Sequence, residues 1–163
     1  MNNRWVGRAG MLLIPLVLSA LLDPAGSSAQ EEHGLSGTQV AVYNLAGAVE
    51  IVPGSGSEVV VQVRRGGSDA GQLDVDMREV AGRQALVIRY PSDQIVYPEL
   101  GRSYRTEIQV RDDGTFYGGR GGSRVRISGS GNGMEAWADL RISVPRGQDI
   151  AVFQAVGETE MAD

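Results

Sequence analysis

Three carboxylates near the middle of the chain, Asp74, Asp76 and Glu79, come closest to a catalytic pattern. Paired carboxylates can hydrolyse glycosidic bonds when they stand roughly 5 to 9 Å apart in a substrate cleft. Asp74 and Asp76 share one face of an expected strand, because Val75 between them points to the other face. Acids that alternate with apolar residues are also typical of the solvent face of a half-buried strand. We favour the solvent face and expect no catalytic residues.

Asp112, Asp113 and Gly114 could begin a calcium-binding loop, since carboxylates and a turn glycine are among its components. An EF-hand loop also needs ligands at alternate positions and a glutamate at its twelfth position. Thr115 and Phe116, which follow, do not supply such ligands. The segment therefore predicts a hairpin turn, because Asp-Gly tolerates positive φ. We expect neither a metal ion nor a cofactor.

The glycine-rich segment from Gly118 to Arg124 could hold an anion through its backbone amides. It lacks the Lys-Ser/Thr pair of a phosphate loop, and no predicted helix follows it. We expect a flexible loop that exposes Arg120 and Arg124. If this loop binds a ligand, a sulfated or carboxylated glycan fits its charge.

Aromatic residues gather in two irregular segments, Pro91 to Tyr104 and Arg111 to Arg124. Sugar-binding surfaces use such side chains, which combine a large apolar area with a polar group. We favour the other interpretation, that they cover the open end of a β core as a small local cluster. The candidate recognition surface consists of Tyr97, Tyr104, Phe116, Tyr117, Arg120 and Arg124.

The composition excludes several classes of site. The chain of 163 residues has no cysteine and a single histidine, His33. This excludes disulfide frameworks, cysteine-based zinc sites and cysteine nucleophiles, and it disfavours a Ser-His-Asp triad. All 15 basic residues are arginine, and 20 acidic residues leave a net charge of −5. That balance argues against nucleic acid as a partner.

The first residues are typical of an export signal. Arg4 and Arg8 precede an apolar run from Met11 to Leu22, and Ser27 to Ala29 provides small residues for a signal peptidase. The apolar run has 12 residues, fewer than the about 20 that span a bilayer. The alternative is an uncleaved N-terminal anchor. We expect export to the periplasm, the cell surface or the medium.

The rest of the chain predicts strands. From Gln30 onward, Val and Ile together number 24 and Leu only 6, and there are 20 glycines. β-Branched residues suit a pleated surface, and glycine supplies tight turns. Apolar and polar residues alternate in short runs such as Glu58 to Arg65. The connections are too short for crossover helices, which leaves an all-β sandwich, barrel or solenoid.

The segment from Gly37 to Gly67 has a strand ending in Asn44, a turn at Gly47, a second strand, a Gly/Ser turn at 53–57 and a third strand. This pattern resembles the opening of an adhesin family of bacterial exported domains, which are built from β-strand repeats and have no known function. Further weak matches extend the resemblance over nearly all of the chain after the signal, as far as Ala155-Val156-Gly157-Glu158.

The resemblance implies a right-handed β-solenoid-like stack of short strands, with a β-sandwich as the alternative. It brings no catalytic residues, and the family usually continues through more short repeats after the position of Glu158. We therefore expect a signal peptide at 1–29, a flexible tail at 30–36 and one β-rich domain at 37–163 that is incomplete at its C-terminus.

The resulting functional expectation is an exported, non-catalytic domain with a structural or adhesive role at the cell envelope. Its partners would be an envelope glycan or an envelope protein, with no membrane span in the mature chain. Self-association through the last expected strand, Asp149 to Val156, is a further expectation. Two alternatives remain: a polysaccharide-active enzyme on a β-helix, and a periplasmic sensory or interaction module.

We predict cleavage after Ala29, because small residues at positions 27 and 29 fit the requirement of the signal peptidase. Mass spectrometry of the exported protein should show an N-terminus at Gln30, either free or cyclised. An exported protein that still begins at Met1 would contradict this prediction.

Overall fold

The structure is a computed structural model that describes residues 30–117 and 121–162. These residues form strands and two short 3₁₀ helices, η1 (Ala70–Gln72) and η2 (Pro98–Leu100), so the all-β prediction is confirmed. No helix in these ranges has the length and apolar character to cross a membrane. The signal peptide expected at 1–29 lies outside the described residues.

The strands form three mixed sheets, in which parallel and antiparallel pairs occur side by side. Sheet A has the order β1-β4-β11-β3-β13, sheet B the order β12-β2-β6-β5, and sheet C the order β10-β7-β9-β8. The strands of sheet A are β1 (Gln30–Leu35), β4 (Val59–Gly66), β11 (Trp137–Val144), β3 (Val49–Pro53) and β13 (Thr159–Met161). Those of sheet B are β12 (Asp149–Val156), β2 (Gln39–Ala46), β6 (Arg83–Arg89) and β5 (Asp74–Val80). Those of sheet C are β10 (Met134–Glu135), β7 (Gln94–Val96), β9 (Ser123–Ser128) and β8 (Arg105–Val110).

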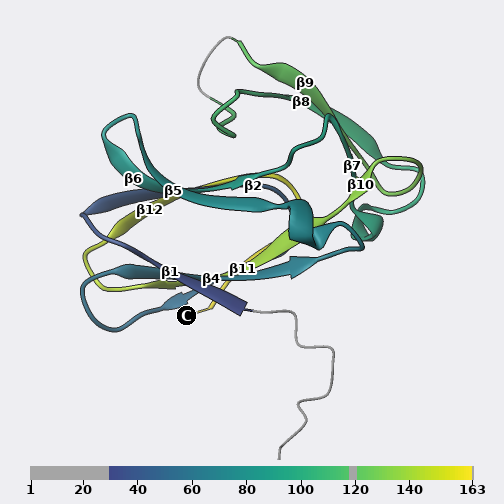
Figure 1. Cartoon of the computed structure of the whole chain (residues 1–163). Coiled ribbons are helices and arrows are strands. Elements are labelled where there is room, and N and C mark those ends of the chain that lie inside the picture. The colour runs from purple at the N-terminus through teal and green to yellow at the C-terminus, as the bar shows by residue number, and fades with distance from the viewer. Residues whose placement is uncertain (1–29, 118–120, 163) are drawn as a thin grey trace, which may run out of the picture.

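Sheet B lies between the other two sheets, and both of its faces are covered (Figure 1). On β2, Val40 and Val42 pack in the cluster that includes Val61 of sheet A. Ala41 and Tyr43, which point the opposite way, pack in the cluster that includes Ile127 of sheet C. A strand buried on both faces needs apolar residues at successive positions, and β2 supplies them in the run Val-Ala-Val-Tyr.

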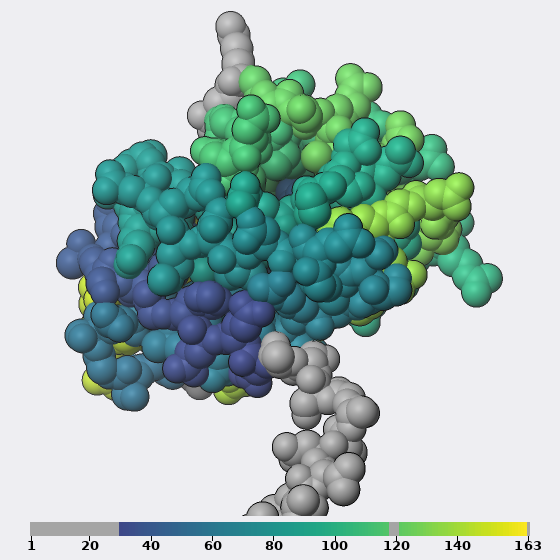
Figure 2. Space-filling model, in the orientation of Figure 1, coloured from purple at the N-terminus to yellow at the C-terminus, as the bar shows by residue number. Residues whose placement is uncertain are grey.

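Residues 30–35, which the sequence led us to expect as a flexible tail, instead form strand β1 at the edge of sheet A. β1 pairs antiparallel with β4 and lies beside it on the molecular surface (Figure 2). Its apolar anchor, Leu35, is fully buried, and Glu31 lies 2.8 Å from the guanidinium of Arg65 on β4. An edge strand tolerates such charged side chains because only one of its sides is paired.

Two strand–turn–strand units, far apart in the sequence, stack in register; each is called a rung. The middle rung runs from β2 through Gly47 to β3, and the last rung from β12 through Gly157 to β13. Every paired residue of the last rung lies 110 positions after its partner, as in Val42 and Val152. The middle rung lies in turn on β6 in sheet B and on β11 in sheet A.

The stacking brings backbones together closely where the rungs turn. Gly47 has φ +134° and Gly157 has φ +125°, a region that L side chains rarely adopt. A Cβ on Gly47 would overlap the carbonyl oxygen of Ala138, and a Cβ on Gly157 would overlap that of Gly47. Each rung can therefore reach its hydrogen-bonding distance only because the corner residue is glycine.

We predict that Gly47→Ala destabilises the fold by about 3 kcal/mol or more, since it adds an overpacked contact to an unfavourable φ. Gly56→Ala is the matched control: φ is +95° there, but the added Cβ would meet nothing within 4 Å. It should cost only about 1–2 kcal/mol. Urea unfolding of both variants measures the difference, and equal losses would contradict the close stacking.

Candidate functional site

The last rung exposes an edge that no other described strand covers. β12 pairs only with β2, and β13 pairs only with β3, within the residues of the structure. The opposite side of the stack is covered, because β5 pairs antiparallel with β6 and β4 pairs antiparallel with β11. We call the free sides of β12 and β13 the open edge. It is the candidate functional site, because unpaired strand edges can bind a further strand.

Backbone groups of the open edge point away from the protein at alternate residues. The N–H of Asp149 donates to the carbonyl of Thr38 next to β2, at 2.9 Å. Since successive residues of a parallel strand bond to opposite sides, Val152 and Gln154 direct their N–H and C=O groups outward. Directly after β13, the N–H of Ala162 donates to the carbonyl of Ile51 at 2.9 Å, so the N–H and C=O groups of Met161 point outward.

Side-chain amides connect the rungs at their corners. Asn44, fully buried, donates from Nδ2 to the carbonyl of Ala138 at 2.7 Å and accepts the hydroxyl of Tyr90 at 2.8 Å. In the last rung Gln154 occupies the matching position and donates to the carbonyl of Gly47. Each amide thus satisfies a backbone carbonyl of the neighbouring layer of strands: Ala138 on β11 for Asn44, and Gly47 of the middle rung for Gln154. Burial raises the pKa of the Tyr90 hydroxyl well above its usual value. The hydroxyl therefore stays protonated and remains a hydrogen-bond donor.

Aromatic rings form a second row across the rungs. Tyr43 and Phe153 are stacked, with ring centroids 4.5 Å apart and an interplanar angle of 13°. Phe116 contacts Tyr43 edge-on from the β8–β9 connection, at 5.9 Å. Tyr117, the next residue, lies 6.4 Å from Phe153 and is 56% exposed. The outer end of this row is therefore accessible at Phe153 and Tyr117.

Of the four aromatic residues in the candidate recognition surface, two are buried and two are exposed. Tyr97 and Phe116 are buried, whereas Tyr104 and Tyr117 are exposed. Tyr97 packs on Trp137 at 5.8 Å and lines a small pocket with Tyr104, Gly157 and Glu158 at the corner of the last rung. The two exposed tyrosines therefore flank the last rung, Tyr104 at its corner and Tyr117 beside β12.

The two arginines of that surface do not join the tyrosines in one described site. Arg124 on β9 is exposed and lies 3.5 Å from Glu107 of β8. Arg120 lies outside the described residues.

Burial raises the pKa of Tyr97 to about 12, and the negative charges of Glu99, Asp139 and Glu158 contribute to the rise. Its hydroxyl therefore stays protonated and neutral at physiological pH.

A row of charges crosses the outer face of sheet A. Gln62, Arg141, Glu50 and Glu160 occupy successive positions on β4, β11, β3 and β13. Arg141 and Glu50 form an ion pair. Glu160, next to Glu50, has no ion-pair partner among the described residues. The row therefore ends at the open edge with an acid beside an acid, an unfavourable arrangement unless a cation follows.

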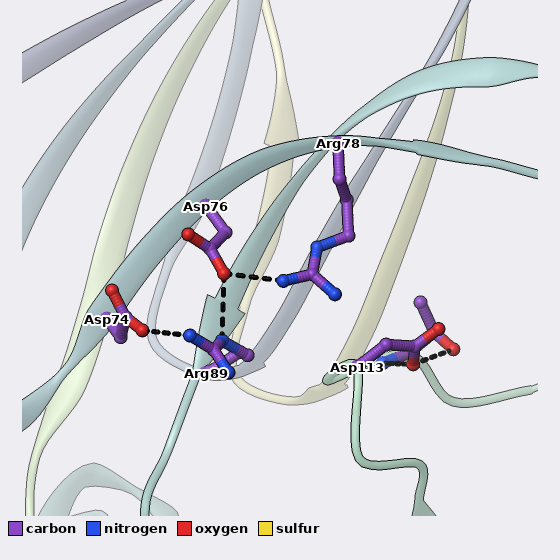
Figure 3. A network of polar contacts seen from close by, with 6 residues as sticks. Asp74, Asp76, Arg78, Arg89 and Asp113 are labelled. Atoms are coloured by element: carbon purple, nitrogen blue, oxygen red, sulfur yellow. Dashed lines mark hydrogen bonds and ion pairs between the residues drawn. The ribbon is translucent and has the colours of Figure 1, made fainter.

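The carboxylates considered for catalysis are held in ion pairs. Arg89 lies between Asp74 and Asp76, and Arg78 contacts Asp76 from the other side at 2.5 Å (Figure 3). Asp74 and Asp76 come from β5, and Arg89 from its antiparallel neighbour β6. The two acids thus bind the same guanidinium, an arrangement that links strands β5 and β6.

An open cleft of about 720 Å³ lies between this strand pair and sheet C. Leu45, Ile88 and Val125 line it with apolar side chains, and Arg89 and Arg111 line it as well. Arg89 is already bound to Asp74 and Asp76, and Arg111 donates to the hydroxyl of Thr115 at 2.8 Å. Both arginines of the cleft thus bind groups of the protein itself.

The Asp112–Gly114 segment forms a turn, as the sequence led us to expect. Gly114 has φ +82°, and its N–H donates to the carbonyl of Arg111 at 2.8 Å. Asp113 accepts hydrogen bonds from the N–H and the hydroxyl of Thr115, at 2.9 and 2.7 Å. No metal-binding group of acids and histidines occurs in the part of the chain that the structure describes. The turn directs Phe116 into the core.

Hydrogen bonds also set the ionisation of Asp113. Partial burial raises its pKa, but the two bonds from Thr115 and the charge of Arg111 outweigh burial, so the net shift is downward. A lowered folded-state pKa means that ionised Asp113 stabilises the fold above its unfolded pKa. That contribution is lost as the pH falls through the folded-state pKa.

We predict that Asp113→Asn lowers the free energy of unfolding by about 1 kcal/mol at pH 7, and that this loss shrinks toward zero in acid. Urea unfolding at pH 7 and in steps below pH 4 measures both differences. The control is Asp112→Asn, since the exposed Asp112 accepts no hydrogen bond in the described residues. A loss that persists unchanged in acid would contradict the assigned role.

Sequence reasoning missed the 110-residue relation between the rungs. Residues 39–47 read Gln-Val-Ala-Val-Tyr-Asn-Leu-Ala-Gly, and residues 149–157 read Asp-Ile-Ala-Val-Phe-Gln-Ala-Val-Gly. The shared aromatic–amide–x–x–Gly spacing is the signal that would have found it. No family model matches this chain, nor does any curated protein or solved structure. The site is accordingly defined by its own geometry.

Proposed function

We propose that this chain is an exported, non-catalytic β-repeat domain with a structural or adhesive role at the cell envelope. The observation that carries the proposal is the stack of rungs in register, ending at the open edge of β12 and β13. Of the two expected partners, an envelope protein is favoured and an envelope glycan is not. A protein can add a strand, which pairs with all the outward N–H and C=O groups of the edge.

The same observations support a finer description of the fold. The parallel pairs β11-β3-β13 and β12-β2-β6 repeat a strand–corner–strand path, as in a solenoid. Sheet B, between sheets A and C, adds a layered packing like that of a sandwich. We propose a solenoid-like stack of sheets A and B, covered by sheet C. The resemblance to exported bacterial adhesin domains is consistent with this arrangement.

A proline on the open edge tests the proposed attachment. Val152→Pro removes an outward N–H and leaves the bonds between β12 and β2 in place. Gln109→Pro is the matched control, because Gln109 is exposed on β8, the edge strand of sheet C. The register with β9 makes its N–H point outward as well.

We predict that the unmodified chain and Gln109→Pro fractionate with the envelope, whereas Val152→Pro is released in soluble form. Cell fractionation followed by immunoblotting measures the distribution. Circular dichroism melting of each purified variant checks that the fold is retained. Envelope attachment of a folded Val152→Pro variant, or the absence of the unmodified chain from the envelope, would contradict the proposal.

A further inference from the structure

The rows that cross the stack continue to its last rung, so they specify what a next rung must contain. Three rows matter: the corner amides, the aromatic rings and the charges on sheet A. Each row places one residue type at a fixed distance from the corner glycine. The inference from them rests on the proposed attachment through the open edge.

The corner row requires a glycine preceded by an amide. Asn44 and Gln154 both stand three residues before their corner glycines, Gly47 and Gly157. Asn44 donates to the carbonyl of Ala138 on β11, and Gln154 donates to the carbonyl of Gly47 at the corner of the middle rung. The carbonyl of Gly157 is the next in this series and accepts no hydrogen bond within the described residues. An incoming Asn or Gln would satisfy it, and an incoming glycine would fit over it without a Cβ clash.

The aromatic row requires a ring one residue earlier. Tyr43 and Phe153 precede their corner glycines by four positions and stack face to face. The outer face of Phe153 is only partly covered, with Tyr117 beside it. A third ring in the same register would extend the stack, which adds favourable contact beyond the area buried.

The charge row requires a cation three residues after the corner. Glu50 and Glu160 hold that position in the two rungs, and only Glu50 is neutralised, by Arg141. Glu158 adds a further negative charge at the corner of the last rung. Arg or Lys in the next rung would stand directly beside Glu160, where a cross-strand pair of opposite charges is favourable.

We propose that the open edge recognises a partner protein through a strand–corner–strand segment with the spacing aromatic-(Asn/Gln)-x-x-Gly-x-x-(Arg/Lys). The segment pairs in parallel with β12 and β13, and its cation lies against Glu160. A second copy of this chain fits less well. Antiparallel pairing of two β13 strands would bring Glu160 near its own counterpart, and β1, another free edge, carries Glu31 and Glu32.

Synthetic peptides that carry the proposed spacing test the rule directly on the purified full chain. The probe is residues 39–53 of this chain carrying Glu50→Arg, which matches the proposed spacing. The control peptides are the native 39–53 sequence and the Arg peptide that also carries Gly47→Val. Binding is measured by fluorescence anisotropy. Analytical ultracentrifugation of the chain alone measures self-association.

The Arg peptide should bind about tenfold more tightly than the native peptide, because repulsion from Glu160 becomes attraction. The difference should shrink at high salt. The Gly47→Val peptide should not bind. In the Glu160→Arg chain the preference should reverse in favour of the native peptide, which distinguishes recognition of charge from loss of folding.

Equal binding of the Arg and native peptides, or an unchanged preference in the Glu160→Arg chain, would overturn the rule. So would tight self-association of the chain that no peptide displaces. Failure of the peptides alongside release of Val152→Pro from the envelope would reject the rule and leave the proposed attachment standing. Selective peptide binding with a Val152→Pro chain still attached would reject the attachment alone.

Discussion

The close approach of backbone to backbone at the corners is the constraint on which the rest of the structure depends. Gly47 lies over the carbonyl of Ala138, and Gly157 lies over that of Gly47, with no space for a side chain between them. This approach fixes the register of β12 on β2 and of β13 on β3 at once. Once the register is fixed, the rings of Tyr43 and Phe153 stack and the amide of Gln154 reaches the rung below.

Sheet B shows how burial on two faces constrains a sequence. Its central strand β2 has seven consecutive buried residues, and from Val40 to Tyr43 their side chains alternate between two apolar clusters. The buried polar residue among them, Asn44, is tolerated because its amide groups bond to Ala138 and Tyr90. Phe116, directed inward by the Asp113 turn, fills space between sheets B and C that short strands alone would leave open.

Local patterns in the sequence predicted much of the fold but little of its long-range pairing. Val59, Val61 and Val63 alternate as a half-buried strand should, and they form the buried face of β4. β1 was not predicted as a strand because most of its residues are polar and do not alternate with apolar ones. It forms a strand through its pairing with β4, which the local sequence does not show. The sequence did not distinguish the buried Tyr97 and Phe116 from the exposed Tyr104 and Tyr117. The two buried rings lie in irregular segments whose direction is set by contacts with Trp137 and Tyr43.

The order of sheet A has a mechanical consequence. β1 and β13 lie at opposite edges of this sheet, and β4, β11 and β3 lie side by side between them. A force that separates these two edges acts perpendicular to the strands, so the inter-strand hydrogen bonds carry the tension one after another rather than all together. β13, with three residues, would detach first and leave β3 as the new edge. A tether through this sheet would yield stepwise under tension, and an added strand beside β13 would become the first to peel.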